Sequence, residues 1–229
     1  MILSLEKADL YDYVKNQINH FFPDKYVFSG RDTAAAFELA LERCEECFRV
    51  ITLGGYHDNK GNVLFSHLHG DQYATFIYYL SNSLWNYSAN KILCDKLLAL
   101  NRTLHSIFIS YKNNMPDHFV LAHPIGTILG NAIYSDYLVV FQGVTVNTSQ
   151  DDNGNCAPIL GKGLFLAADS RIIGNQPVGD YVSLGVNAMV YQQSIPDNSV
   201  VTCKDGSLCN VAARQKRTCM AQNYFNVQI

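Results

Sequence analysis

The chain has 229 residues, of which 48% are hydrophobic and 16% charged, the composition of a globular protein with one or two domains. Its net charge of -3 excludes a basic footprint for nucleic acid, and no apolar run approaches the roughly 20 residues of a membrane span. The N-terminal stretch carries acidic residues early and lacks the basic and apolar regions of a secretory signal. Seven cysteines without framework spacing fit reduced thiols, so we expect a soluble protein of the cytoplasm.

The first half of the chain has the pattern of helices. Apolar residues recur at helical spacing in four stretches, which are residues 1–22, 33–50, 72–85 and 89–109. Pro23 is expected to end the first helix, and Asp32 is placed to cap the second. These patterns predict an α-helical domain over residues 1–115.

A Cys-x-x-Cys pair, Cys44 and Cys47, falls on the second of these helices. A zinc or redox site needs further ligands, and no second cysteine pair or His-x₃-His follows. We therefore interpret the pair as two small residues on one face of a helix.

The second half of the chain repeats every six residues. Aliphatic residues stand at this step without a miss from Leu160 to Val190, namely Leu160, Leu166, Ile172, Val178, Leu184 and Val190. Tyr134, Val140 and Val146 keep the step upstream of a polar interruption. A hexapeptide β-solenoid has this period, because each face of its triangular coil takes six residues and points one large side chain inward. The fold class is therefore α+β, an N-terminal α-helical domain followed by a left-handed parallel β-helix over residues 116–202 and a tail over residues 203–229. Gly161, Gly179 and Gly185 each follow an aliphatic position, where we expect a Cβ to crowd a corner.

A series of motifs runs through this repeat in a fixed order. They are His123-x-x-Gly126, Gln142-x-Val144-Thr145, Pro158 with Gly161, Ala167-Ala168, Ile173-Gly174-Asn175 and Ile195-Pro196. In this order the motifs resemble the serine O-acetyltransferases, which are left-handed β-helix acyltransferases that use acetyl-CoA. The likeness covers about eighty residues closely and extends weakly to His69-Gly-Asp-Gln72 in the helical domain.

The resemblance implies that His123 is the catalytic histidine. An acceptor hydroxyl is a poor nucleophile until it loses its proton, and an imidazole is suited to take that proton at neutral pH. The imidazolium then protonates the leaving CoA thiolate, while backbone N–H groups at a coil corner hold the oxyanion. The alternative is a histidine that only caps the first coil.

The chain departs from the family at the group that orients this histidine. The family has an aspartate about one coil upstream, where this chain offers Ser106 or Phe108. Asp117 is the nearest preceding carboxylate, but it is one face away rather than a full turn. A hydroxyl, a backbone carbonyl or Asp117 therefore remain as candidates for orienting His123.

A second departure concerns the acceptor. An Arg-His pair that helps hold the amino-acid substrate in the family is replaced by Cys156 and Ala157, and an acid beside the histidine by Ala122. A serine carboxylate favours a cation opposite it, so we expect a neutral acceptor such as a sugar or polysaccharide precursor. Two alternatives stay open, a serine O-acetyltransferase of cysteine synthesis and a non-catalytic β-solenoid scaffold. Candidate acceptor-binding residues are His67, His69, Asp71 and Gln142.

For acetyl-CoA, the only cofactor indicated, the resemblance implies a groove between neighbouring subunits. Candidate groove residues are Ala168, Gly185 and Val186, with Thr148 on the polar loop and Lys204 or Arg171 for the phosphates. Asp151 and Asp152 on the same loop are interpreted as solvated acids, and no metal is expected. One chain supplies only one wall of this groove, and the resemblance implies that a homotrimer completes it, or a hexamer if the helical domains join two trimers.

Overall fold

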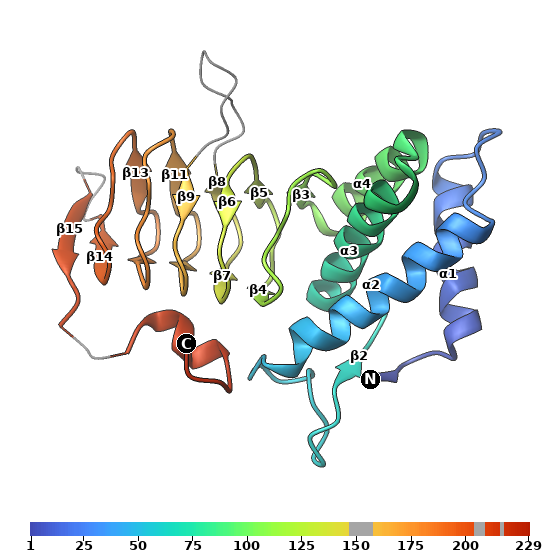
Figure 1. Ribbon diagram of the computed structural model, residues 1–229, viewed down its shortest axis with the longest axis horizontal. Coiled ribbons are helices and arrows are strands. Elements are labelled where there is room, and N and C mark those ends of the chain that lie inside the picture. The colour runs from blue at the N-terminus through green and yellow to red at the C-terminus, as the bar shows by residue number, and fades with distance from the viewer. Residues whose placement is uncertain (147–157, 204–208, 216–217) are drawn as a thin grey trace. The chain divides into compact units, whose positions relative to one another are not determined.

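The structure is a computed structural model that describes residues 1–146, 158–203, 209–215 and 218–229 (Figure 1). The chain divides into two compact units. The first comprises Met1–Arg49 and Gly54–Lys112, and the second comprises Val50–Leu53 and Asn113–Ile229. Helices fill the first unit and short parallel strands the second, so the α+β class expected from the sequence is confirmed.

The helical unit is built from four helices and three short strands among its residues. In chain order they are β1 (Ile2–Leu3), α1 (Lys7–Phe21), α2 (Arg31–Arg49), β2 (Leu64–Phe65), α3 (Gly70–Ser88), α4 (Lys91–His105) and β3 (Phe108–Ile109). Helix α3 is the centre of this unit, because every residue from Asp71 to Leu84 is buried and α2 and α4 both pack against it. Strand β1 pairs in parallel with β2.

Three expectations about helix ends are wrong. The first helix begins at Lys7, because Ile2 and Leu3 pair with β2 instead. Asp32 lies inside the first turn of α2, which begins at Arg31, so it is not the cap. Helix α4 ends at His105 because Ser106 adopts a left-handed conformation with φ 53°, and the apolar residues that follow form β3.

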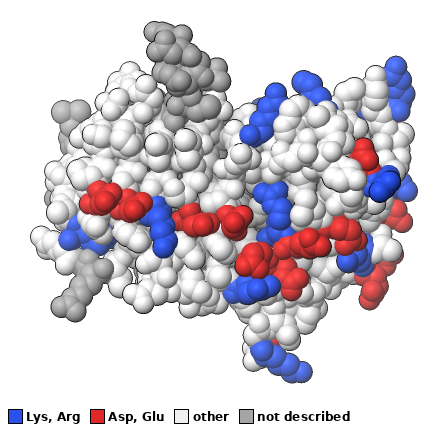
Figure 2. All heavy atoms as spheres, viewed as in Figure 1, with Lys and Arg blue, Asp and Glu red and all other residues white. Residues whose placement is uncertain are grey.

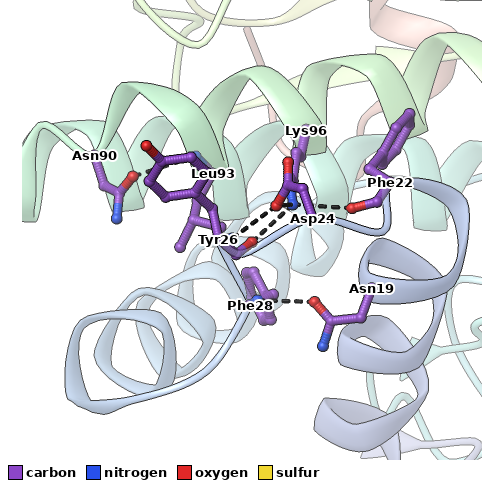
Figure 3. Close-up of polar contacts among 8 residues, drawn as sticks. All are labelled: Asn19, Phe22, Asp24, Tyr26, Phe28, Asn90, Leu93 and Lys96. Carbon is purple, nitrogen blue, oxygen red and sulfur yellow. Dashed lines mark hydrogen bonds and ion pairs between the residues drawn. The ribbon is translucent and has the colours of Figure 1, made fainter.

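A buried lysine fixes the segment between α1 and α2 (Figure 3). The ammonium of Lys96, on α4, donates to the carbonyl oxygens of Phe22 (3.0 Å) and Tyr26 (2.7 Å) and to the carboxylate of Asp24 (2.5 Å). Farther along the segment, the Phe28 amide donates to the Asn19 side-chain oxygen at 2.8 Å. Because the ammonium is matched by three acceptors, its burial is compensated.

The second unit is a coil of short parallel strands stacked on three faces (Figure 1). The first face has the order β14-β12-β10-β7-β4, with β14 Ser199–Thr202, β12 Ser183–Leu184, β10 Phe165–Leu166, β7 Leu138–Val140 and β4 Phe119–Leu121. The second has the order β13-β11-β8-β5, with β13 Met189–Tyr191, β11 Arg171–Ile173, β8 Thr145–Val146 and β5 Ile128–Leu129. The third pairs β6 (Ile133–Tyr134) with β9 (Ile159–Leu160) and continues through bridges at Val178 and Ile195.

The predicted six-residue ladder forms the core of this coil. Residues eighteen positions apart lie directly above one another, as in the pairs Leu160 with Val178, Leu166 with Leu184 and Ile172 with Val190. All six ladder residues are at most 3% exposed. The period of six is therefore confirmed as the spacing from one face to the next.

Two of the three predicted corner glycines are required by close backbone packing. A Cβ on Gly161 would overlap the backbone of Gly179, and a Cβ on Gly179 would overlap Asp197. The expectation for Gly185 is wrong, because a Cβ there would lie 3.4 Å from the Val201 carbonyl oxygen, in ordinary contact.

The C-terminal segment closes the coil unit. Strand β15 (Asn210–Ala213) pairs antiparallel with β14, and the short helix η1 (Met220–Tyr224) packs near β7. Cys203 and Cys209 form a disulfide. The expectation that the thiols are all reduced is therefore wrong for this pair, which β14 and β15 bring together at the start of their antiparallel pairing.

Candidate functional site

One corner of the coil, between the first and second faces, carries His123 and three of the residues predicted for donor binding, Ala168, Gly185 and Val186. Strand pairing aligns Leu121, Val140, Leu166 and Leu184 on the first face and Ile128, Thr145, Arg171 and Met189 on the second. In the first coil, Leu121 and Ile128 are seven positions apart. In each of the next three coils the corresponding residues are five positions apart. The first coil therefore has two extra residues at this corner, where His123 and Pro124 lie.

His123 is the exposed part of this two-residue bulge. Its backbone is left-handed, with φ 50°, and its carbonyl oxygen accepts a hydrogen bond from the Ile125 amide at 2.7 Å. The Pro124 carbonyl accepts from Thr127 at 3.2 Å, which fixes the far side of the bulge. An imidazole presented outward on a braced bulge is accessible to small molecules, as general base catalysis requires.

Below His123, the predicted residues Gln142, Ala168 and Val186 stack in a row, one per coil. The amides of Gly143, Asp169 and Asn187 donate to the carbonyls of Ile125, Gln142 and Ala168 at 2.9 to 3.0 Å, so each coil is bonded to the one before. Gln142 and Val186 are exposed, and Ala168 is half-buried. Gly185 immediately precedes Val186, at the end of β12. The structure thus brings His123, Gln142, Ala168, Gly185 and Val186 to one corner.

Asp117, the predicted partner of His123, lies at a different corner. Asp117 precedes β4 and His123 follows β4, so the two residues lie at opposite ends of the strand. At Asp117's corner, carboxylates brace the backbone: Asp136 accepts from the His118 amide at 3.1 Å and Asp180 from the Lys162 amide at 2.7 Å. Figure 2 shows acidic side chains in a row along the coil unit.

The predicted acceptor residues of the helical unit have structural roles there. His69 is the N-cap of α3, and its Nδ1 accepts from the Gln72 amide at 3.5 Å. Asp71 is 8% exposed in the first turn of the same helix, where its charge raises the pKa of the buried Tyr56 hydroxyl in addition to the larger effect of burial. His67 contacts the Ser4 hydroxyl at 2.8 Å. The His-Gly-Asp-Gln motif therefore starts a helix; its role toward an acceptor stays a prediction.

Some predicted residues lie outside the described part of the chain. These are Thr148, Asp151, Asp152, Cys156, Ala157 and Lys204. The other phosphate candidate, Arg171, is exposed at the start of β11. Asp169, on the corner row, was not singled out from the sequence; the only signal was one charged residue among the small residues Ala167, Ala168 and Ser170.

Cys44 and Cys47 are buried on α2, and burial raises the pKa of the Cys44 thiol well above its ordinary value. This agrees with their interpretation as small residues on one face of a helix, a face that packs into the core. Among the described residues, no group of three or more His, Cys, Asp or Glu side chains is arranged to hold a metal. The described helices include none with the length and apolar character to cross a membrane.

Curated proteins whose sequences are similar to this chain include serine acetyltransferases. Over 119 residues the chain is 27% identical to a serine acetyltransferase of Synechococcus elongatus, covering 51% of this chain and 49% of that protein. Over 130 residues it is 23% identical to a serine acetyltransferase of Staphylococcus aureus, covering 56% of this chain and 60% of that protein. The chain thus spans about half to three fifths of the length of these curated relatives. No family model matches it.

Solved structures show the same likeness over more of the chain. A serine acetyltransferase in complex with cysteine matches with a TM-score of 0.71 at 18% identity, covering 96% of this chain and 84% of that one. A serine acetyltransferase in complex with CoA matches with a TM-score of 0.65 at 18% identity, covering 90% and 84%. The enzyme of Neisseria gonorrhoeae matches with a TM-score of 0.60 at 19% identity, covering 86% and 72%. The predicted resemblance to the serine O-acetyltransferases is therefore confirmed.

Proposed function

We propose that the protein is an acetyl-CoA-dependent O-acetyltransferase with His123 as general base. The observation that carries the proposal is the two-residue bulge that presents an exposed His123 at the head of a row of small and exposed residues. Similarity to serine acetyltransferases, one of them solved with CoA, supports acetyl-CoA as the donor.

The chemistry assigns two proton transfers to His123. The imidazole takes the proton of the acceptor hydroxyl as its oxygen attacks the thioester carbonyl carbon. The carbon–sulfur bond then breaks, the acetyl group stays on the acceptor oxygen, and the imidazolium gives its proton to the thiolate of CoA. The histidine is regenerated, so one hydroxyl is acetylated for each free thiol released. Asp117 stays a candidate for orienting the imidazole, although β4 lies between the two residues in the chain.

The donor arm is proposed to lie along the row below His123. Ala168, Gly185 and Val186 offer small or exposed side chains there, so an extended chain can approach the backbone. The row forms one wall, and we propose that a second copy supplies the other in a homotrimer of left-handed coils, the hand typical of hexapeptide repeats.

Two acceptor classes are proposed. A neutral hydroxyl-rich acceptor, such as a sugar, is favoured by the sequence, because Cys156 and Ala157 stand where a cation would hold a carboxylate. L-Serine is the second candidate, favoured by the names of the relatives and by the neighbour solved with cysteine.

The test measures thiol release from acetyl-CoA with serine, monosaccharides and nucleotide sugars as acceptors. His123→Ala should lower the rate by about 100- to 10,000-fold with an unchanged circular dichroism spectrum. The matched control is His20→Ala, which removes an exposed histidine from α1 and should leave the rate unchanged. A near-normal rate in His123→Ala would remove this residue from the mechanism. A wild-type protein that neither binds CoA nor releases thiol would favour the scaffold alternative.

A further inference from the structure

Asp169 is the charged side chain on the corner row that begins at His123. It follows Ala168, is exposed, and has a left-handed backbone with φ 59°. Its amide donates to the Gln142 carbonyl oxygen at 2.9 Å, which ties its backbone to the preceding coil. Its place is therefore fixed by the coil.

The carboxylate of Asp169 points back toward the preceding coil, which lies between it and the coil that carries His123. It occupies the space beside Gly143, where a Cβ would overlap its Oδ1 atom. Gly143 in turn stacks on Gly126, since a Cβ on Gly126 would lie 3.9 Å from the Gly143 Cα atom. Gly126 comes three residues after His123. Asp169 lies two coils from His123 and successive coils are about 4.8 Å apart, so the two backbones lie roughly 10 Å apart along the coil axis, a distance that the two side chains and a small polar molecule can span.

The Asp169 carboxylate makes no polar bond that holds the described coils together. Within the described part of the chain it accepts no hydrogen bond and lies in no ion pair, whereas Asp136, Asp180 and Asp197 at another corner each accept from a backbone amide. A carboxylate has acceptor sites for two or more donors, and bonds from charged or polarised donors are the strongest that it makes. An exposed, fixed and unused acceptor on the row of the candidate base is placed to bind a substrate.

We propose that Asp169 determines acceptor specificity by binding a hydrogen-bond-donating group, an ammonium or a pair of neighbouring hydroxyls, next to the hydroxyl that is acetylated. Its negative charge also disfavours acceptors that place an anion at the same point. The inference rests on the proposed function, because it assigns the acceptor chemistry of that same corner.

The test compares wild type with Asp169→Asn, which keeps the shape of the side chain and removes its charge. Binding of ethanolamine, methyl glucoside and glycerate is measured by calorimetry in the presence of CoA, and CoA binding is measured separately. Ethanolamine supplies an ammonium, methyl glucoside neighbouring hydroxyls, and glycerate an anion. Wild type should bind ethanolamine or methyl glucoside, and Asp169→Asn should weaken that binding at least tenfold while the Kd for CoA changes less than twofold. The matched control is Asp32→Asn, which removes the same charge from an exposed site on α2.

Three results would overturn the inference: equal binding of the probes by both proteins, no binding of ethanolamine or methyl glucoside by wild type, or a change confined to CoA. The last would place Asp169 against the donor instead. Kinetics provide a second readout, since the KM for the acceptor should rise about tenfold and kcat change little. A protein that binds the probes through Asp169 but transfers no acetyl group would keep this inference and refute the proposed function.

Discussion

Phe225, near the end of the chain, packs edge-on against Tyr137 on the coil, with ring centroids 5.1 Å apart and planes at 79°. Phe225 is 3% exposed and also forms an antiparallel bridge with Ile51. The neighbouring Tyr224 packs against Phe141 and Phe165, at 5.9 and 5.7 Å. The C-terminal segment is therefore part of the folded coil unit.

Phe225→Ala should destabilise the protein by about 3–4 kcal/mol, because it empties a buried aromatic site and removes the contact with Tyr137. Chemical denaturation of the full chain measures this loss. Gln228→Ala changes an exposed residue of the same segment and should cost less than about 0.5 kcal/mol. Equal stabilities of the two variants would show that the segment is not docked.

The coil was predictable and the C-terminal segment was not, for a physical reason. Each turn of the coil packs against the next, so Leu166 and Leu184 leave a local period in the sequence. The C-terminal segment instead pairs with residues far away in the chain, as in the bond from the Thr52 hydroxyl to the Asn223 carbonyl oxygen. Such pairing leaves no period.

At the candidate site, the ordered motifs predict His123 as the catalytic residue, but its position on a bulge follows only from the strand register. Leu121 and Ile128 are seven residues apart, whereas the corresponding residues of the following coils are five apart. The two extra residues can be recognised only after the strands have been aligned. Asp169 was missed because a single acid in a corner has no pattern; the space that it takes beside Gly143 is a property of the fold.

Lys96→Met should destabilise the helical unit by about 2–4 kcal/mol, because it leaves the Phe22 and Tyr26 carbonyls without their donor. Lys91→Met is the matched control on the same helix. Its ion pair with Asp95 is exposed and should contribute less than about 0.5 kcal/mol. Thermal unfolding of both variants measures the difference.

The same substitution has a second readout at Asp24. The hydrogen bond from Lys96 is the main cause that lowers the pKa of the Asp24 carboxyl below its ordinary value. Lys96→Met should therefore raise this pKa, as measured by carbon NMR titration. An unchanged pKa would show that the contact in Figure 3 does not form in solution.

His105 should make stability depend on pH. Burial lowers its pKa to about 4 from 6.5, while its Nδ1 lies 2.8 Å from the Asn101 side-chain oxygen. Below pH 6.5 the unfolded chain binds a proton that the folded chain excludes, so stability is full above that pH and falls as the pH drops toward 4. Allowing for partial exposure, the loss at pH 5 is about 1–2 kcal/mol.

The check is the stability difference between wild type and His105→Gln at pH 7 and pH 5. The glutamine keeps a donor toward Asn101 but does not titrate, so the difference between the two proteins should shift in favour of the variant at pH 5. A difference independent of pH would refute a half-buried His105 that stays neutral in the folded protein.

The disulfide of Cys203 and Cys209 should protect both thiols from alkylation in denaturant until a reductant is added. Peptide mass spectrometry reads this directly, and buried Cys94 serves as the control that reacts without reductant once the chain is unfolded. Because the bond closes a short loop, Cys203→Ser should cost about 2 kcal/mol or less. Alkylation of Cys203 without reductant would restore the expectation of reduced thiols.

The corner glycines give the sharpest test of coil packing. Gly161→Ala should destabilise by about 2–4 kcal/mol, because the new Cβ would lie 2.5 Å from the Gly179 carbonyl oxygen and neither backbone can yield without shifting a coil. Gly185→Ala adds the same methyl group at the next corner region, 3.4 Å from the Val201 oxygen, and should change stability by less than about 1 kcal/mol. Urea denaturation ranks the two variants. Since Gly185 is part of the proposed donor wall, Gly185→Ala should instead weaken CoA binding. If Gly185→Ala were as unstable as Gly161→Ala, the coils at Gly185 would stack more closely than the strand register implies.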